Sequence, residues 1–176
     1  MGVDIGTTSV KAVAADGDGT VVARARVPHD LVVSAPDELA HRPDQAWRYG
    51  VRRALAQVVS GLTGHDVAAV DVAAMVPSLC AVDSAGSALT PGLLYGDARA
   101  GRPAGADPSQ SGELLAFLAW CVGEAPHAHG YWPAQAMANH ALGGEAVIDT
   151  VTAMTALPLF DYEGWDPQVA ARAGTG

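Results

Sequence analysis

The residues with the clearest chemical use lie at the start of the chain, in the run GVDIGTTSVK from Gly2 to Lys11. Apolar and polar residues alternate on both sides of a central Gly-Thr-Thr, which predicts two strands joined by a tight turn. Glycine lets a backbone come close to phosphate oxygens, and such a turn can present amide groups and two hydroxyls to an anion. An ionised Asp4 can hold Mg²⁺ through water, and Lys11 can place a positive charge beside a terminal phosphate.

The pattern predicts a phosphate-binding hairpin. Its candidate cofactor-binding residues, of which Asp4 is also the metal ligand, are Asp4, Gly6, Thr7, Thr8 and Lys11. An ordinary hairpin with a Gly-Thr turn and a surface lysine fits the same spacing, because short motifs of this kind also occur by chance. Both interpretations stay open at this point.

Composition places the chain among ordinary globular proteins. With 176 residues, 49% hydrophobic and 16% charged, it can bury the core of one domain or large subdomain. The formal net charge of −9 works against nucleic acid and anionic membranes as partners, because no basic stripe is available to displace counterions. No apolar run reaches the ~18 residues of a membrane span, and no signal peptide precedes the first strand, so we expect a cytoplasmic protein.

Hydrophobic periodicity predicts strands and helices that alternate along the chain, which indicates a mixed α/β layer structure. Strands are expected over residues 2–5, 9–15, 19–27, 67–76, 79–83 and 91–95. Helices are expected over 44–62, 113–123 and 133–142. The run 67–76 is nearly all apolar, which is typical of an interior strand covered on both faces. Residues 101–112 are rich in Gly, Pro, Ala and Ser, which indicates a flexible connection.

Five segments, in this order along the chain, resemble the N-terminal lobe of the FGGY carbohydrate kinases, which are relatives of actin and hexokinase. The segments are the turn in Gly2–Lys11, the helix start Asp44–Trp47, the core strand in Val67–Val76, the hairpin and YGDAR motif in Leu79–Arg99, and the GGEAVIDT turn with its sequel in Gly143–Asp166. The first segment alone is weakly specific. Five segments in the right order over most of the chain are much more specific for the family.

The resemblance implies an actin-like ATPase (ribonuclease H-like) α/β lobe, with a mixed sheet flanked by helices. It also implies ATP and Mg²⁺ as cofactors and the phosphorylation of a sugar or polyol hydroxyl, a reaction in which positioning and charge neutralisation do most of the catalysis. On this resemblance the residues of Gly2–Lys11 contact metal and phosphates, and Asp97 hydrogen-bonds sugar hydroxyls beside Arg99. Asp97 in Gly-Asp-Ala also fits a helix N-cap, and both roles stay open.

The chain departs from the family pattern at the sugar. Where xylulose-type members carry Met-His-Gly, this chain has Val76, Pro77 and Ser78, which the resemblance makes candidate substrate-binding residues. A histidine donor is therefore replaced by Ser78 or a backbone group. The small-molecule partner is expected to be a sugar or polyol, and xylulose cannot be singled out.

The resemblance covers only the first lobe of the family. The aspartate with which these kinases deprotonate the sugar, and their adenosine-binding lobe, come later in the family pattern than residue 176. We therefore expect residues 1–176 to form an incomplete N-terminal lobe with the C-terminal lobe absent, inactive alone, and we assign no catalytic residue. A non-catalytic sugar-binding module from this family and an actin-like structural protein are the alternatives. Because apolar surface is expected to be exposed where a second lobe would pack, self-association of the chain, for example as a homodimer, stays open.

Smaller signals have structural explanations. His127 and His129 could bind a metal with a third ligand, although an exposed loop explains them better. Cys80 and Cys121 lack metal-ligand spacing and are expected to be buried. Asp149 or its neighbour is expected to cap a short helix rather than to act in catalysis.

Overall fold

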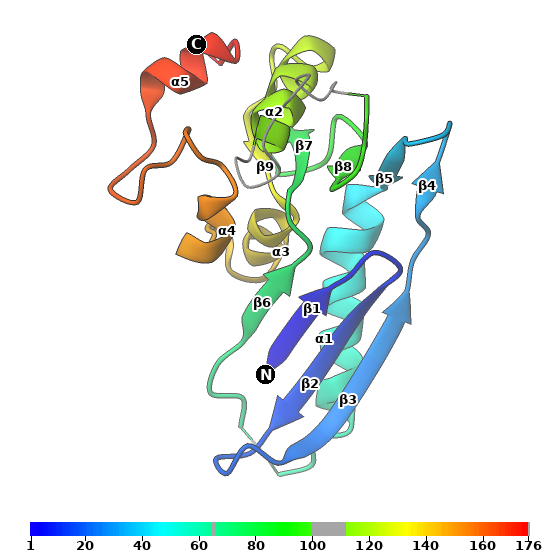
Figure 1. Ribbon diagram of the computed structural model, residues 1–176. Helices are drawn as coiled ribbons and strands as arrows, with labels where there is room; N and C mark the ends of the chain where they lie inside the picture. Colours follow the sequence, from blue (N-terminus) through cyan, green and yellow to red (C-terminus); the bar gives the residue numbers. More distant parts are fainter. Residues whose placement is uncertain (65, 100–111, 176) are drawn as a thin grey trace.

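The computed structural model describes residues 1–64, 66–99 and 112–175, which form two sheets with helices packed against them (Figure 1). The strands are β1 (Gly2–Ile5), β2 (Ser9–Ala15), β3 (Val21–Pro28), β4 (Val32–Val33), β5 (Leu39–His41), β6 (Asp71–Ala74), β7 (Ser78–Val82), β8 (Gly92–Leu94) and β9 (Gly130–Trp132). The helices are the π-helix η1 (Asp44–Tyr49), α1 (Gly50–Ser60), α2 (Gly112–Glu124), α3 (Ala134–Gly143), α4 (Thr150–Met154) and α5 (Pro167–Arg172).

The first sheet carries the N-terminal hairpin. Its strand order is β3-β2-β1-β6, in which β1 runs antiparallel to β2 and parallel to β6. Helix α1 packs behind β1, β2 and β3 (Figure 1). Because strand side chains alternate between faces, Val3, Ile5 and Val10 are buried on the side of α1, and their neighbours point to the other face.

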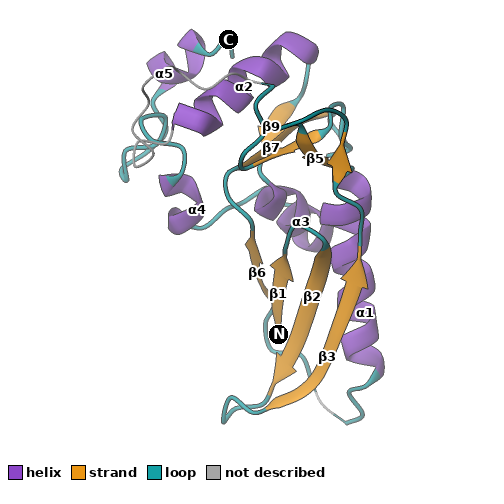
Figure 2. Cartoon of the chain, turned by 45° about the vertical axis from the view of Figure 1, so that its right-hand side comes forward, coloured by secondary structure: helices purple, strands orange, loops and turns teal. Residues whose placement is uncertain are grey.

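The second sheet lies beyond the end of the first sheet at which the β1–β2 turn is found (Figure 2). Its strand order is β4-β5-β8-β7-β9. A second hydrophobic cluster forms where α2 packs on β7, with Phe117 and Cys121 completely buried against Leu79 and Leu93. The second sheet therefore places two short strands, β5 and β8, close to the turn of the first.

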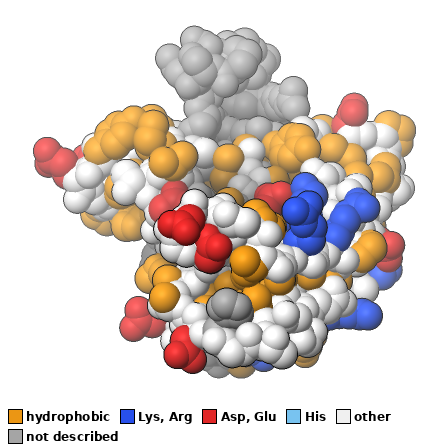
Figure 3. All heavy atoms as spheres, turned by 90° about the horizontal axis from the view of Figure 1, so that it is seen from below, with side chains coloured by type: hydrophobic (Ala, Val, Ile, Leu, Met, Phe, Trp, Pro, Cys, Tyr) orange, Lys and Arg blue, Asp and Glu red, His pale blue; other side chains and the backbone are white. Residues whose placement is uncertain are grey.

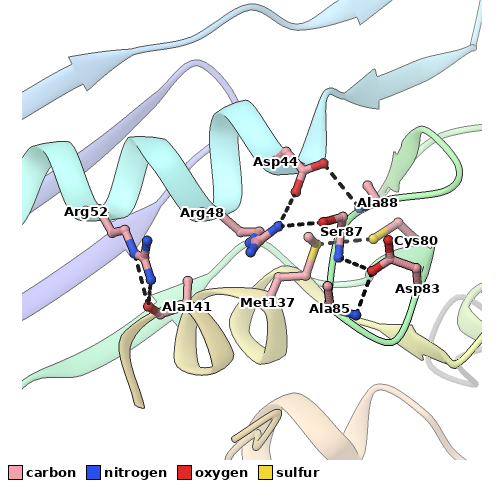
Figure 4. A network of polar contacts seen from close by, with 10 residues as sticks. All are labelled: Asp44, Arg48, Arg52, Cys80, Asp83, Ala85, Ser87, Ala88, Met137 and Ala141. Carbon is pink, nitrogen blue, oxygen red and sulfur yellow. Dashed lines mark hydrogen bonds and ion pairs between the residues drawn. The ribbon is translucent and has the colours of Figure 1, made fainter. Parts of the chain in front are cut away.

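Polar contacts fix the helix η1–α1 against the hairpin that joins β7 to β8 (Figure 4). Asp44 accepts from Arg48 Nη1 at 2.8 Å and from the Ala88 amide at 3.2 Å, and Arg48 also donates to Ser87 Oγ. One turn further, the Arg52 guanidinium donates to the Ala141 carbonyl in the last turn of α3, where helix carbonyls have no intrahelical partner. These bonds hold the β7–β8 hairpin and α3 to the helix that packs on the first sheet.

The sequence predicts most of these elements correctly. Strands over 2–5 and 9–15 are confirmed without change, and the helix over 44–62 is found as η1 followed by α1. The interior strand expected over 67–76 is wrong in extent: β6 has only Asp71–Ala74, and of these only Val72 is buried. The reason is that β6 pairs with β1 alone, and β1 has four residues.

The segment 28–42 is mixed in composition and fits a loop or an edge strand at 31–33, where the structure has β4, whereas two further short strands are not predicted from the sequence. β5 falls in a segment that reads as a loop, and β9 in an aromatic stretch before α3, because three residues are too few to show a period. The flexible connection expected over 101–112 lies outside the described residues, apart from Gly112, which begins α2. In the part of the chain that is described, no helix is long and apolar enough to cross a membrane.

The end of the molecule that carries the β2–β3 turn has a mixed surface. Seen from that end, hydrophobic side chains lie among acidic and basic ones (Figure 3). The large hydrophobic residues that are exposed include Val21, Val22, Val59, Val67 and Val70. Self-association through apolar surface where a second lobe would pack stays a prediction.

Candidate phosphate and substrate site

Asp4 and Lys11 face each other across the N-terminal hairpin. They are direct partners in the antiparallel register of β1 and β2, and Lys11 Nζ lies 3.2 Å from Asp4 Oδ2. Their side chains are 53% and 58% exposed, on the sheet face opposite α1. A surface pair of this kind contributes little to stability, so both groups are available to a ligand at little cost to the fold.

Two carbonyl groups of the turn from Gly6 to Thr8, those of Thr7 and Thr8, accept hydrogen bonds from within the protein. The Gly6 amide closes the turn by donating to the Ser9 carbonyl at 3.0 Å. The Thr7 carbonyl accepts from His41 Nε2 at 2.7 Å, and the Thr8 carbonyl accepts from the His29 amide at 3.1 Å. Among the described residues, the amides of Thr7 and Thr8 have no acceptor, so both can donate to an anion.

His41 is held in one protonation state by its surroundings. Its side chain is buried, with Nδ1 accepting from the indole of Trp47 at 2.9 Å. Burial lowers the pKa of His41 to about 4, and the nearby His29 ring acts in the same direction. The rings of His29 and His41 meet edge to face with centroids 4.4 Å apart. At neutral pH the imidazole is therefore uncharged.

Tyr95, which follows β8, connects the turn to the second sheet. Its hydroxyl lies 2.9 Å from Thr7 Oγ1, and the residue is 46% exposed. An exposed aromatic ring beside the turn offers an apolar face and a polar tip to a bound polyol. The site thus contains groups from both sheets.

Asp97 lies just beyond Tyr95, but its carboxylate is buried and fully hydrogen-bonded. It accepts from the amide of Leu39 at 2.7 Å, from the amide of Arg99 at 2.9 Å, and from Nε and Nη2 of the Arg99 guanidinium. The side chain of Asp97 is 0% exposed and that of Arg99 is 16% exposed. The bond to the Arg99 amide is the contact of an Asx turn; no helix begins within residues 97–99, so the N-cap role considered for Asp97 stays a prediction.

The three residues in place of Met-His-Gly lie between β6 and the start of β7. Val76 is 38% exposed and Pro77 is partly exposed, whereas Ser78 is buried and accepts from the Ala134 amide at 3.1 Å. Ser78 Oγ therefore bonds to the first turn of α3 and keeps its hydrogen and one lone pair for another partner. Substrate contact by Val76, Pro77 and Ser78 stays a prediction.

Comparison with known proteins shows the family to which the chain belongs. Residues 1–104, more than half of the chain, match the model of the N-terminal domain of the FGGY family of carbohydrate kinases. The chain belongs to this family. It is 32% identical over 74 residues to a glycerol kinase from Leifsonia xyli subsp. xyli, a match over 41% of this chain and 14% of that enzyme.

Solved structures show the same fold over nearly all of this FGGY chain. A xylulose kinase from Rhodospirillum rubrum superposes with a TM-score of 0.84 at 24% identity, over 98% of this chain and 40% of its own. A gluconate kinase from Lactobacillus acidophilus superposes with a TM-score of 0.81 at 19% identity, over 99% of this chain and 39% of its own. A glycerol kinase from Plasmodium falciparum with ADP superposes with a TM-score of 0.78 at 12% identity, over 99% of this chain and 42% of its own. The actin-like α/β fold is confirmed. The chain spans about two fifths of the length of these structures.

The FGGY chain also has a cavity of about 400 Å³ beside the second sheet. His41 and Arg99 line it, together with Ala40, Arg42, Asp44 and residues of the β7–β8 connection. Asp4, Thr7, Lys11 and Asp97 are not among its lining residues. Among the described residues, the cavity is therefore lined by groups other than the amides of Thr7 and Thr8.

Metal and thiol chemistry elsewhere has little support. Within 1–64, 66–99 and 112–175, no three His, Cys, Asp or Glu side chains are grouped to hold a metal, and His127 is exposed. Burial raises the pKa of Cys121 to about 11, which makes its thiol unreactive. Asp149 N-caps α4, and bonds from the Thr152 amide and Gln135 lower the pKa of its carboxyl. Its structural role is confirmed.

Two residues of the site, His41 and Tyr95, are absent from the candidates that the sequence supplies. Tyr95 lies inside the YGDAR segment, and its aromatic ring next to a candidate sugar ligand is a signal that could have found it. His41 carries no such signal, because its partner Thr7 is 34 residues away and β5 reads as a loop. Only the paired sheets bring them together.

Proposed function

We propose that residues 1–176 are the N-terminal lobe of an ATP-dependent kinase that phosphorylates a hydroxyl of a sugar or polyol. The amides of Thr7 and Thr8 and the ammonium group of Lys11 bind the terminal phosphates of ATP. The observation that carries this proposal is the pair of unused amides beside an exposed carboxylate and ammonium group. Family membership and the structures of kinases for glycerol, xylulose and gluconate support it.

Asp4 suits a magnesium ion. Its carboxylate is half exposed, and the only hydrogen-bond partner of its side chain among the described residues is Lys11, so one oxygen is free. Magnesium prefers carboxylate and water oxygens and is commonly shared with substrate phosphates, so few protein ligands are needed. When bound, the ion would neutralise phosphate charge, and Asp4 and the Thr8 hydroxyl are the groups that would hold it directly or through water.

The polyol is proposed to lie between the Val76–Ser78 segment and Tyr95. Val76 and Tyr95 are both partly exposed and apolar, as contacts to the C–H groups of a sugar require. In this arrangement Asp97 acts indirectly, by fixing the loop that carries Tyr95. Its carboxylate has no lone pair without a donor of the protein, since Leu39 and Arg99 supply four N–H groups.

Neither carboxylate that the sequence assigns to the site is placed as a general base. Asp97 is saturated with donors and Asp4 is proposed to hold magnesium, so neither is expected to take the proton of a substrate hydroxyl. Since general-base help is worth about 10²–10⁴ in rate, we propose that residues 1–176 bind nucleotide without turning over. The same observation favours a second candidate, a non-catalytic sugar-binding module of FGGY origin.

Titration of the ¹⁵N-labelled chain with MgATP tests the proposal. With MgATP we expect shifts in the amide signals of Gly6–Lys11. Magnesium tripolyphosphate should shift the same signals, and adenosine should not shift them. Shifts confined to other residues, or none, would overturn it.

A coupled assay of ADP release with a panel of pentoses, hexoses and polyols tests the second half of the proposal. We expect no turnover. Rapid turnover would contradict the argument about the base. If calorimetry finds sugar binding whose affinity is unchanged by ATP and by Lys11→Ala, the non-catalytic module is favoured.

A further inference from the structure

We propose that His41 is a positioning residue: its uncharged imidazole, oriented by Trp47, holds the Thr7 carbonyl inward and so turns the Thr8 amide toward the phosphate. This inference rests on the proposed function, since it assigns to a buried histidine the geometry of the phosphate turn. His41 does not touch the ligand. It acts through the backbone of Thr7.

The two hydrogen bonds of His41 define which ring nitrogen carries the proton. An indole N–H can only donate, so Nδ1, 2.9 Å from Trp47 Nε1, must be the acceptor. A carbonyl oxygen can only accept, so Nε2, 2.7 Å from the Thr7 oxygen, must carry the hydrogen. Only the neutral Nε2–H tautomer makes both bonds at once. A change of tautomer or a second proton would break at least one of them.

The orientation of the Thr8 amide follows from the geometry of the peptide unit. The Thr7 carbonyl and the Thr8 N–H belong to one planar trans peptide group, in which the two bonds point in opposite directions. His41 draws the carbonyl toward the interior, so the N–H of Thr8 points away from it. If this peptide turned over, the carbonyl oxygen would face the phosphate and repel it.

The imidazole has little freedom to leave this position. His41 is 1% exposed and Trp47 is 0% exposed, and the ring of His29 closes one side. Gly92 lies opposite His41 in the β5–β8 pairing, and a Cβ at that position would collide with the Trp47 indole. A strand glycine therefore makes room for the tryptophan that orients the histidine.

The first test uses the unchanged chain without nucleotide. Labelling histidine with ¹⁵N and recording long-range imidazole correlations at pH 7 distinguishes the two neutral tautomers and the cation. We expect the Nε2–H form for His41. Finding the Nδ1–H form or the cation would overturn the proposal, whatever the chain does with ATP.

The second test compares variants. His41→Leu removes the donor, and we expect it to shift the Thr8 amide signal and to weaken MgATP binding about tenfold, the effect of one lost hydrogen bond. His41→Gln keeps a donor and an acceptor, and its affinity should stay within about threefold of the original. Should His41→Leu not fold, His41→Asn, which is too short to reach the Thr7 carbonyl, takes its place with the same expected loss.

His140→Leu is the matched control. This half-buried histidine also packs on a tryptophan, with its centroid 4.9 Å from that of Trp132, but it lies away from the turn. Its loss should leave the Thr8 signal and MgATP affinity unchanged within about twofold. Equal losses in the His41 and His140 variants, or no loss in a folded His41→Leu chain, would overturn the proposal. If the unchanged chain binds no MgATP, the proposed function fails, and the tautomer and the Thr8 signal still decide the role of His41.

Discussion

The turn at Gly6–Thr8 and the loop at Asp97–Arg99 are joined by the contact between Thr7 and Tyr95, yet they use their polar groups in opposite ways. In the turn, the carbonyls of Thr7 and Thr8 accept hydrogen bonds from the protein, the amides of the same two residues have no acceptor among the described residues, and an exposed ion pair lies beside them. The loop has a buried carboxylate on which four N–H groups converge. The first arrangement leaves capacity for a ligand, and the second uses all of it within the fold.

The difference has a physical cause. Removing a carboxylate from water costs several kcal/mol unless opposite charge and donors replace the solvent, and Arg99 with two backbone amides supplies them at Asp97. Asp4 stays in contact with water and needs no such replacement. An acidic residue next to a substrate can therefore stabilise the site without touching the ligand.

The strongest way to break this comparison is Asp97→Asn. The change leaves the Arg99 guanidinium without a counter-charge in a nearly closed environment, and we expect the free energy of unfolding to fall by about 3 kcal/mol. Urea denaturation, fitted with a common slope, measures it.

Asp4→Asn is the control for that experiment. Because its ion pair is exposed, we expect a change within about 0.5 kcal/mol in stability and a loss of MgATP binding. The comparison would fail if Asp97→Asn unfolded like the unchanged chain and lost sugar binding instead.

As the pH falls from neutral, the protonation of His41 should lower the free energy of unfolding before the protonation of carboxylates does. In the unfolded chain His41 takes up a proton near pH 6.5, but in the folded chain only near pH 4, because burial lowers its pKa. Between these values the unfolded state binds more protons, so the free energy of unfolding falls as the pH falls, by about 2 to 3 kcal/mol in all. Burial also lowers the pKa of His29, which adds a loss of the same sign.

His41→Gln separates the two histidines. The variant lacks the His41 contribution, so its stability measured by urea denaturation from pH 7 to 4.5 should decline less steeply than that of the unchanged chain. The carboxyl groups of Asp149 and Asp161, whose pKa values are lowered by backbone amides, lose their contribution below this range. Parallel curves for both chains would show that His41 is protonated equally in the folded and unfolded states.

Lys11→Met tests whether the exposed charge beside the turn serves ligand binding rather than stability. The ammonium group is more than half exposed and, within the described part of the chain, pairs only with Asp4, so stability should change by less than about 0.5 kcal/mol. A charge-assisted bond to phosphate is worth more, and we expect MgATP affinity to fall about tenfold to thirtyfold by calorimetry. Arg26→Met, on the next strand opposite Lys11, is the control and should leave affinity nearly unchanged.

Local pattern was enough to place Asp4 and Lys11. Strand alternation puts Val3, Ile5 and Val10 inside, which forces these two charged residues to the outer face, as the structure shows. The saturation of Asp97 could not be read from the sequence, because one donor is the amide of Leu39, 58 residues earlier. His41 depends on a three-residue strand with no period of its own. What the sequence misses is therefore set by pairing between short strands.

The smallest expected effect concerns the contact that joins the two regions. Tyr95→Phe removes the hydroxyl beside Thr7 Oγ1 and keeps the ring, and water can replace the bond because Tyr95 is 46% exposed. We expect stability within about 0.5 kcal/mol and MgATP affinity lower by about twofold to threefold, measured by calorimetry. Tyr131→Phe, whose hydroxyl donates to the Ala125 carbonyl away from the site, should leave affinity unchanged. A tenfold loss for Tyr95→Phe would mean that the hydroxyl itself contacts the nucleotide, and Tyr95 would then belong to the phosphate site as well as to the proposed polyol site.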